Sequence, residues 1–268
     1  MKKNFFLLTV VLVLLSFSSC KKVWDYVKDH PNDTADNCRI ENIYFTQYYY
    51  SGPFDTPDLL FDDTASFKYN SQGQLISVDY ASTKYNLTID VNPVLGHYFK
   101  YDNQGRLIAH IEQFLEFDGG RLGSLFWHKF VYVNNNTIID SAFTYAGGFS
   151  DNDDETVSGS YAGASYIILD DFGRIVKDKK ATYNYDANGN LVKPGATYTN
   201  KTSMLQTNKT LMFISRDYSV NAPAGFATRF NSNKLPVKIN SGKIPIFTDG
   251  HSGVYYDNEN IRVEYQCK

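Results

Sequence analysis

The sequence predicts an all-β fold, in which an antiparallel meander of hairpins forms a large curved sheet. Strand-length segments rich in Ile, Tyr and Phe alternate with clusters of polar turn residues along most of the chain. Aromatic residues make up 16% of the 268 residues, and they favour the pleated, half-buried surfaces of sheets. No window shows the periodicity of a long amphipathic helix. These observations do not decide whether the sheet stays open or closes partly into a half-barrel or a sandwich.

Residues 1–19 have the features of a secretion signal. Lys2 and Lys3 form a basic start, residues 5–15 are an apolar stretch, and small residues then lead to Cys20. The apolar stretch is shorter than the roughly 20 residues that a membrane-spanning helix takes. The alternative is an ordinary secretion signal that happens to be followed by a cysteine.

The last residues of this segment, Phe-Ser-Ser-Cys at 17–20, resemble the lipobox of bacterial lipoproteins, with Phe17 where that family more often has Leu. The resemblance implies cleavage before Cys20 and lipidation of that cysteine by acyl chains such as palmitate, which anchor a protein to a membrane. We therefore expect a lipid-anchored protein of the cell envelope, in the outer membrane. The two lysines after Cys20 favour its inner face over the cell surface without deciding between them. Residues 20–37 are polar and are expected to form a tether.

A single β domain is expected from residue 38 to residue 268. Its strands are predicted at residues 38–50, 107–117, 125–133, 137–145, 165–169, 181–185 and 210–215. The net charge of −3 predicts no nucleic-acid partner, since proteins that bind polyanions usually carry a basic patch.

Two of the three cysteines remain once Cys20 carries lipid. Cys38 opens the first predicted strand, and Cys267 lies on the alternating apolar face of residues 261–267. In an exported protein this even pair predicts a disulfide between Cys38 and Cys267, with both sulfurs in the core where the two ends of the domain meet. The alternative is a pair of separate buried thiols.

A short turn pattern repeats along the chain. In its clearest copy, Tyr-Asp-Asn-Gln-Gly-Arg-Leu-Ile at 101–108, an aromatic residue ends one strand and Leu starts the next. Asp or Asn bonds its side chain to nearby backbone, and Gly supplies the positive φ of a tight turn. Copies with glycine lie at 69–76, 101–108, 169–176 and 185–192, and weaker copies lie at 230–235 and 256–261. The turn-forming residues are predicted to be Gly73, Asp102, Gly105, Asp170, Gly173, Asp186 and Gly189.

Residues 101–107 match the core of the YD repeat of the RHS family, Tyr-Asp-x-x-Gly-Arg-Leu, and the other copies match it in part. Large RHS proteins build a closed shell, for which this chain is too short and has too few copies. It more closely resembles the small Bacteroidetes-type lipoproteins of unknown function that contain YD-like hairpins. That resemblance implies an architectural role for the repeat, so its aspartates are interpreted as turn-formers.

No pattern of catalytic or metal-binding residues stands out. His-Glu-x-x-His, Cys-x-x-Cys, Gly-x-Ser-x-Gly and the glycine-rich nucleotide loops are all absent. His110 and His128 alternate with other residues of predicted strands, and both are interpreted as sheet-surface residues rather than ligands or bases. The sequence therefore predicts no catalytic residue, no metal site and no cofactor, although a Ser-His-Asp site assembled from distant residues remains open. The five histidines are His30, His97, His110, His128 and His251.

Two other signals have ordinary explanations beside functional ones. The acidic run at 151–155 suits calcium, but it lacks the glycine and the distant glutamate of an EF-hand loop, and a solvated loop also explains it. The aromatic residues at 48–50, 127 and 255–256 suit a carbohydrate platform, but paired aromatics are also common within sheets.

The sequence thus predicts a non-enzymatic envelope protein, a binding or structural module whose partner is a glycan or an envelope protein. One alternative is an accessory protein that captures glycans or other nutrients. The other is a hydrolase with an unmarked active site. Exposed coplanar aromatics along a groove favour glycan capture, whereas convergent carboxylates or a His–Ser contact in a cleft favour the hydrolase.

Overall fold

The computed structural model describes residues 37–49, 59–81, 94–115, 122–145, 160–240, 254–256 and 261–268. The predicted signal, Cys20, the tether up to residue 36 and the acidic run at 151–155 lie outside these residues. Within the described ranges, no helix is both long enough and apolar enough to cross a membrane.

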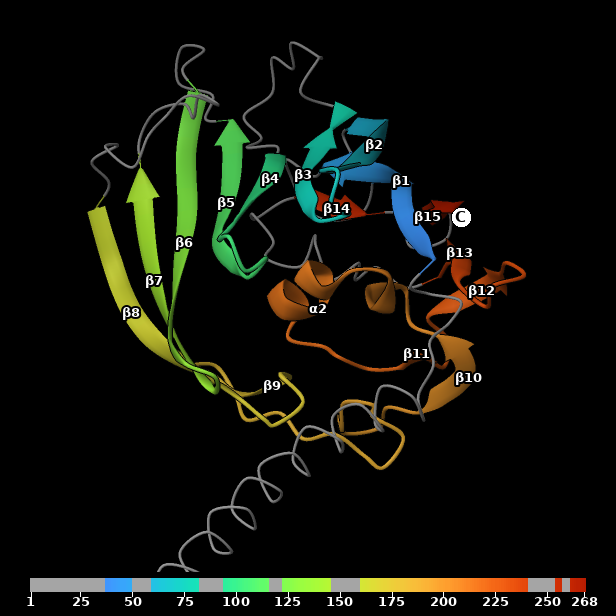
Figure 1. The fold of residues 1–268 in the computed structure, drawn as a ribbon. Coiled ribbons are helices and arrows are strands. Elements are labelled where there is room, and N and C mark those ends of the chain that lie inside the picture. The colour runs from blue at the N-terminus through green and yellow to red at the C-terminus, as the bar shows by residue number, and fades with distance from the viewer. Residues whose placement is uncertain are drawn as a thin grey trace, which may run out of the picture. The chain divides into compact units, whose positions relative to one another are not determined.

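The described strands confirm the predicted all-β class, because most of them form a single large antiparallel sheet (Figure 1). From β1 to β9, each strand pairs with the next one along the chain, as a meander does. These strands are β1 (Cys38–Tyr49), β2 (Leu59–Tyr69), β3 (Leu75–Tyr80), β4 (Val94–Tyr101), β5 (Leu107–Leu115), β6 (Leu122–Asn134), β7 (Thr137–Tyr145), β8 (Ser160–Leu169) and β9 (Ile175–Lys177).

The C-terminal part of the chain returns to β1 and extends the sheet on its other side. There β15 (Ile261–Cys267) pairs with β1, and the order continues through β13 (Pro236–Ile239) to β12 (Ala227–Phe230). β14 (Val254–Tyr256) also pairs with β1. The strand order of the sheet therefore begins at β12 and ends at β9. These two edge strands are not paired with each other in the described sheet.

Between β9 and β12, the chain forms a short segment that does not belong to the large sheet. β10 (Tyr198–Thr202) and β11 (Asn221–Pro223) make a second, two-stranded sheet. They are connected through the 3₁₀ helix η2 (Met204–Thr207) and the short helix α2 (Lys209–Ser215). Figure 1 shows the large sheet curving around α2, which lies on its concave side.

Two of the predicted strands were wrong. Residues 210–215, which are rich in strand-favouring side chains, form α2 instead. Asn208 caps this helix by accepting a hydrogen bond from the backbone N–H of Thr210 at 2.8 Å. Residues 181–185 form only isolated bridges, Thr182 with Lys177 and Tyr185 with Leu191. In the first case tertiary burial outweighs local propensity, because Leu211 is fully buried.

Helix α2 and η2 supply the apolar surface that covers part of the concave face. Met204 and Leu211 belong to the same buried cluster as the sheet residues. Phe213 packs edge-to-face on Phe130 of β6, with ring centroids 5.0 Å apart. The Tyr101 hydroxyl at the end of β4 also lies 2.7 Å from the Thr210 hydroxyl, which ties the sheet to the helix.

The repeated turns share one hydrogen-bond pattern. In the turn after β4, Asp102 Oδ1 accepts from the backbone N–H groups of Gln104 and Arg106, both at 2.9 Å, and Gly105 has φ +77°. Side-chain oxygens of Asn70, Asp170 and Asp186 make the same two bonds in their own turns. The glycines of those turns, Gly73, Gly173 and Gly189, all have φ between +75° and +78°.

The turn at 231–235 reaches the same geometry without glycine. Asn231 Oδ1 accepts from the backbone N–H of Leu235 at 2.9 Å, and Lys234 stands in the glycine position with φ +60°. A side chain at positive φ is strained, so this turn is less favourable at that position than the turns with glycine.

Replacing Gly173 with alanine is expected to destabilise the protein by about 1 kcal/mol. Open space surrounds the site of the added Cβ, so the cost comes from the backbone alone. The opposite change, Lys234→Gly, is expected to keep or raise stability, since it relieves the strain at φ +60°. Urea unfolding of both variants measures the difference, and equal losses of stability in the two would contradict this account.

The predicted disulfide is present: Cys38 and Cys267 are bonded, and they face each other in the β1–β15 register. Cys38 is buried, as expected, but Cys267 is exposed. The side-chain amide of Asn233 lies 3.0 Å from the Cys38 sulfur and 3.2 Å from the Cys267 sulfur. The bond therefore links the first and last described strands of the sheet.

Reduction of this disulfide is expected to lower the free energy of unfolding by up to about 5 kcal/mol, because the bond joins residues 229 positions apart. A Cys38→Ser, Cys267→Ser double variant should match the reduced wild type and should not respond to reductant. Thermal melts with and without dithiothreitol make the comparison. If the reductant leaves the melting temperature of the wild type unchanged, the bond contributes no stability.

Candidate functional site

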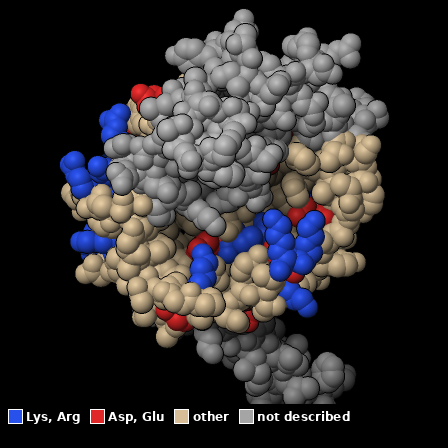
Figure 2. Space-filling view, turned by 180° about the vertical axis from the view of Figure 1, so that it is seen from behind, with Lys and Arg blue, Asp and Glu red and all other residues tan. Residues whose placement is uncertain are grey.

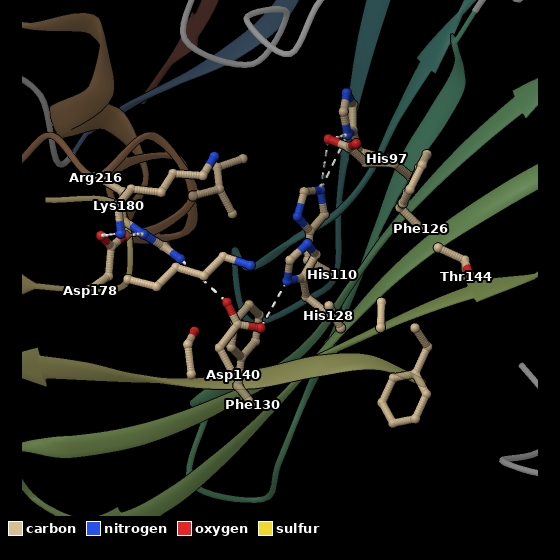
Figure 3. Close-up of a pocket in the computed structure, with 17 residues that line it drawn as sticks. His97, His110, Phe126, His128, Phe130, Asp140, Thr144, Asp178, Lys180 and Arg216 are labelled. Atoms are coloured by element: carbon tan, nitrogen blue, oxygen red, sulfur yellow. Dashed lines mark hydrogen bonds and ion pairs between the residues drawn. The ribbon is translucent and has the colours of Figure 1, made fainter. Parts of the chain in front are cut away.

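A polar pocket lies on the concave face of the sheet, where α2 does not cover it. Its volume is about 350 Å³, and strands β4 to β8 form one side while the segment after β9 and the end of α2 form the other (Figure 3). The residues that carry its chemistry are His97, His110, Glu112, His128, Asp140, Asp178, Lys180 and Arg216. None of the predicted turn residues lines it.

Three histidines stand on three neighbouring strands of this face. In the sheet register, His97 on β4 faces Glu112 on β5, and His110 on β5 faces His128 on β6. The His97 and His110 rings stack with centroids 5.4 Å apart, and those of His110 and His128 with centroids 6.4 Å apart. Phe99 stacks on His110 at 5.0 Å, so aromatic packing fixes the orientation of the central imidazole.

The inner histidines are buried and bonded to each other. His97 Nδ1 lies 3.2 Å from His110 Nε2 and 3.4 Å from Glu112 Oε1, and His97 Nε2 lies 3.2 Å from the Tyr80 hydroxyl. Burial lowers the pKa of His97 to about 4. Burial, together with the neighbouring His97, His128 and Arg216, holds the pKa of His110 well below its ordinary value. Both imidazoles are therefore neutral at pH 7.

The other end of the pocket is a network of charges. His128 Nδ1 lies 2.8 Å from Asp140 Oδ1, and Arg216 reaches Oδ2 of the same carboxylate at 3.7 Å. Arg216 Nε also donates to Asp178 at 3.0 Å. Asp178 accepts a further bond from the Tyr183 hydroxyl at 3.2 Å. One guanidinium thus holds two buried carboxylates from different parts of the chain in place.

Asp178 is stabilised in its charged form. Its burial acts to raise the pKa, but hydrogen bonds from the backbone N–H groups of Ala181 and Lys180 and from Arg216 outweigh that effect and lower the pKa. Arg216 is positioned for this contact as the C-cap of α2, in the left-handed conformation with φ +55°. The helix end therefore sets where the charge network forms.

The interpretation of His110 as a sheet-surface residue was wrong, and His128 lines the pocket rather than an open surface. Their strands carry apolar side chains on the opposite face as well, where Ile111 packs with Trp127 and Phe143. Both faces of these strands therefore carry buried side chains, which alternation alone did not show. The sequence also gave no signal for Asp178 or Arg216, which reach the pocket only through the fold.

The carbohydrate platform receives no support from the described residues. Trp127 packs against Phe143, with ring centroids 5.6 Å apart, and is not among the pocket residues. The side chains of Tyr48–Tyr50 and Tyr255–Tyr256 lie outside the described residues, as do His30 and His251.

Surface charge among the described residues is mixed. On the face drawn in Figure 2, Lys and Arg side chains are scattered and several adjoin acidic ones (Figure 2). Lys68 pairs with Asp79 at 2.6 Å, and Lys193 pairs with Asp217 at 2.8 Å. Such exposed pairs contribute little to stability.

Replacing Arg216 with methionine is expected to cost about 2–3 kcal/mol, because two buried carboxylates lose their shared cation. Lys193→Met removes a cation from an exposed pair and should cost less than about 1 kcal/mol. Because the pKa of Asp178 is lowered, the stability that its carboxylate contributes is present above pH 3.8, the ordinary pKa of Asp. That stability is lost as the pH falls below this value. The difference between wild type and Arg216→Met should therefore shrink in acid. Urea unfolding at neutral and acid pH tests both points, and equal costs for the two variants would contradict the network.

The chain matches no protein-family model and no curated protein. Among solved structures, it is similar to the crystal structure of a porin-like protein from Bacteroides uniformis ATCC 8492. The two share 10% sequence identity, the match covers 85% of this chain and 98% of that chain, and the TM-score is 0.31. A similarity at this level supports no statement about what this chain binds or does.

Proposed function

We propose that this chain is a lipid-anchored envelope protein that binds a small polar ligand in the histidine-lined pocket without converting it. The observation that carries the proposal is the pocket of about 350 Å³, in which three histidines, three carboxylates and one arginine from separate segments converge. A concave site with a few convergent polar groups and perturbed pKa values is the usual form of a small-molecule site.

The site is largely preformed. Ring stacking holds the three imidazoles, and hydrogen bonds hold Arg216 to Asp178. A ligand therefore meets groups whose rotamers are already fixed, which reduces the entropy lost on binding. The mixed charges suit a polar ligand with both donors and acceptors better than a polyanion.

Anchoring is the second part of the proposal, and it rests on the sequence around Cys20. Acyl chains on Cys20 and the polar tether that follows would hold the binding domain at the envelope membrane. Cys20→Ala is expected to abolish incorporation of labelled palmitate and to move the protein out of the membrane fraction. Equal labelling of wild type and variant would reject the anchor.

A ligand screen, together with a variant that fills the pocket with a larger side chain, tests binding in the pocket. A panel of sugars, amino acids and small carboxylic acids is screened by thermal shift in the presence of a chelator, since a ligand that binds only the folded state raises the melting temperature. Ala142 lines the pocket, so Ala142→Leu should abolish the shift, whereas Ala187→Leu at an exposed position outside the pocket should keep it. A panel with no stabilising compound, or equal shifts in both variants, would contradict the proposal.

A hydrolase is the second candidate, because one observation favours it. His128 has a carboxylate partner in Asp140 at 2.8 Å, as a general base does, and Ser165 lines the same pocket. Turnover of an ester or glycoside substrate that is lost in His128→Gln would favour this alternative over simple binding.

A further inference from the structure

We infer that His97, His110 and Glu112 form a binding site for a divalent transition-metal ion such as Zn²⁺ at the inner end of the pocket. The inference rests on the proposed binding function and names one ligand of that site. The three ligand atoms are His97 Nδ1, His110 Nε2 and Glu112 Oε1, and all lie within 4.8 Å of one another.

The separations between these atoms fit a single ion. They are 3.2 Å between the two histidine nitrogens, 3.4 Å from His97 to Glu112 and 4.0 Å from His110 to Glu112. A tetrahedral zinc ion lies about 2.0–2.1 Å from nitrogen and oxygen ligands, which places neighbouring ligand atoms about 3.4 Å apart. The observed values bracket that separation, so side-chain shifts of a few tenths of an ångström are enough to bind the ion.

Neighbouring residues orient the ligands. Ring Nε2 of His97 faces the Tyr80 hydroxyl at 3.2 Å, and an Nε2–H donated to that oxygen leaves the Nδ1 lone pair directed at His110 and Glu112. Tyr80 is itself held by edge-on packing against Phe45, with ring centroids 6.2 Å apart. Such a partner on the far nitrogen is the usual arrangement for a metal-binding histidine.

The types of ligand favour a cation that binds neutral nitrogen. His97 and His110 are 3% and 8% exposed, so both imidazoles are removed from water. Two imidazoles and one carboxylate suit Zn²⁺, Co²⁺, Ni²⁺ or Cu²⁺, whereas Ca²⁺ and Mg²⁺ prefer oxygen ligands throughout. Glu112 supplies the compensating negative charge.

An ion held by these three residues would be open to the pocket. All three ligand residues line the cavity, so the ion can enter from it and can bind water or a polar ligand there. Three protein ligands with one open position are characteristic of zinc sites that act on or hold small molecules.

The alternative is a hydrogen bond between two neutral histidines without an ion. A proton on His110 Nε2 could be donated to His97 Nδ1 across the 3.2 Å between them, and an ion must displace that proton. The metal site predicts that added Zn²⁺ binds, whereas the hydrogen-bonded pair predicts that it does not.

The test is a titration of the chelator-treated, purified full chain with Zn²⁺ followed by calorimetry, and with Co²⁺ followed by visible absorption. We expect one ion per chain, Co²⁺ bands of four-coordinate intensity, and a higher melting temperature with Zn²⁺. His110→Phe and Glu112→Gln should each weaken binding about tenfold or more. Glu41→Gln is the matched control for Glu112→Gln, because it removes the charge of an exposed carboxylate on β1 outside the pocket, and it should keep wild-type affinity.

Wild type that binds no Zn²⁺, or equal losses of affinity in Glu112→Gln and Glu41→Gln, would overturn the inference. Glu112→Gln keeps the test decisive if the buried histidine variant fails to fold, since Glu112 is only half-buried. If the panel compounds stabilise the chelator-treated protein but Zn²⁺ does not bind, the pocket function stands and the metal site alone fails.

Discussion

The structure depends on the burial of the η2–α2 segment against the concave face of the sheet. Leu211 and Met204 are almost fully buried there, and Phe213 packs on Phe130 of β6. A curved sheet with one uncovered face would expose much of its apolar surface, so this short segment completes the core. It covers only part of the face, and the uncovered part is the pocket.

The same segment sets the chemistry of the pocket. Arg216 is the C-cap of α2, and its guanidinium joins Asp140 of β7 to Asp178 after β9. The charged end of the pocket therefore forms only when the helix is docked. The neutral end, with His97 and His110, is built by the sheet alone through cross-strand register. His128 stands between the two ends, stacked on His110 and bonded to Asp140.

Sequence patterns predicted the sheet and the disulfide. Strand alternation predicted the sheet, and the even pair of cysteines predicted the bond between Cys38 and Cys267. The helix at 209–215 was missed because Thr210, Phe213 and Ile214 favour strands, whereas burial of Leu211 and capping by Asn208 stabilise the helix. The histidine cluster was missed although the predicted turn at 101–108 sets the β4–β5 register that places His97 opposite Glu112, because β4 was not among the predicted strands.

The central claim is that the two neutral histidines and Glu112 hold a metal ion at the inner end of the pocket. Anomalous diffraction at the zinc edge, from crystals grown with Zn²⁺, tests it most directly. The account predicts an anomalous peak about 2.0–2.1 Å from His97 Nδ1, His110 Nε2 and a Glu112 oxygen. Imidazole nitrogens still in direct contact, as at the present 3.2 Å, with zinc peaks only at lattice contacts would contradict it.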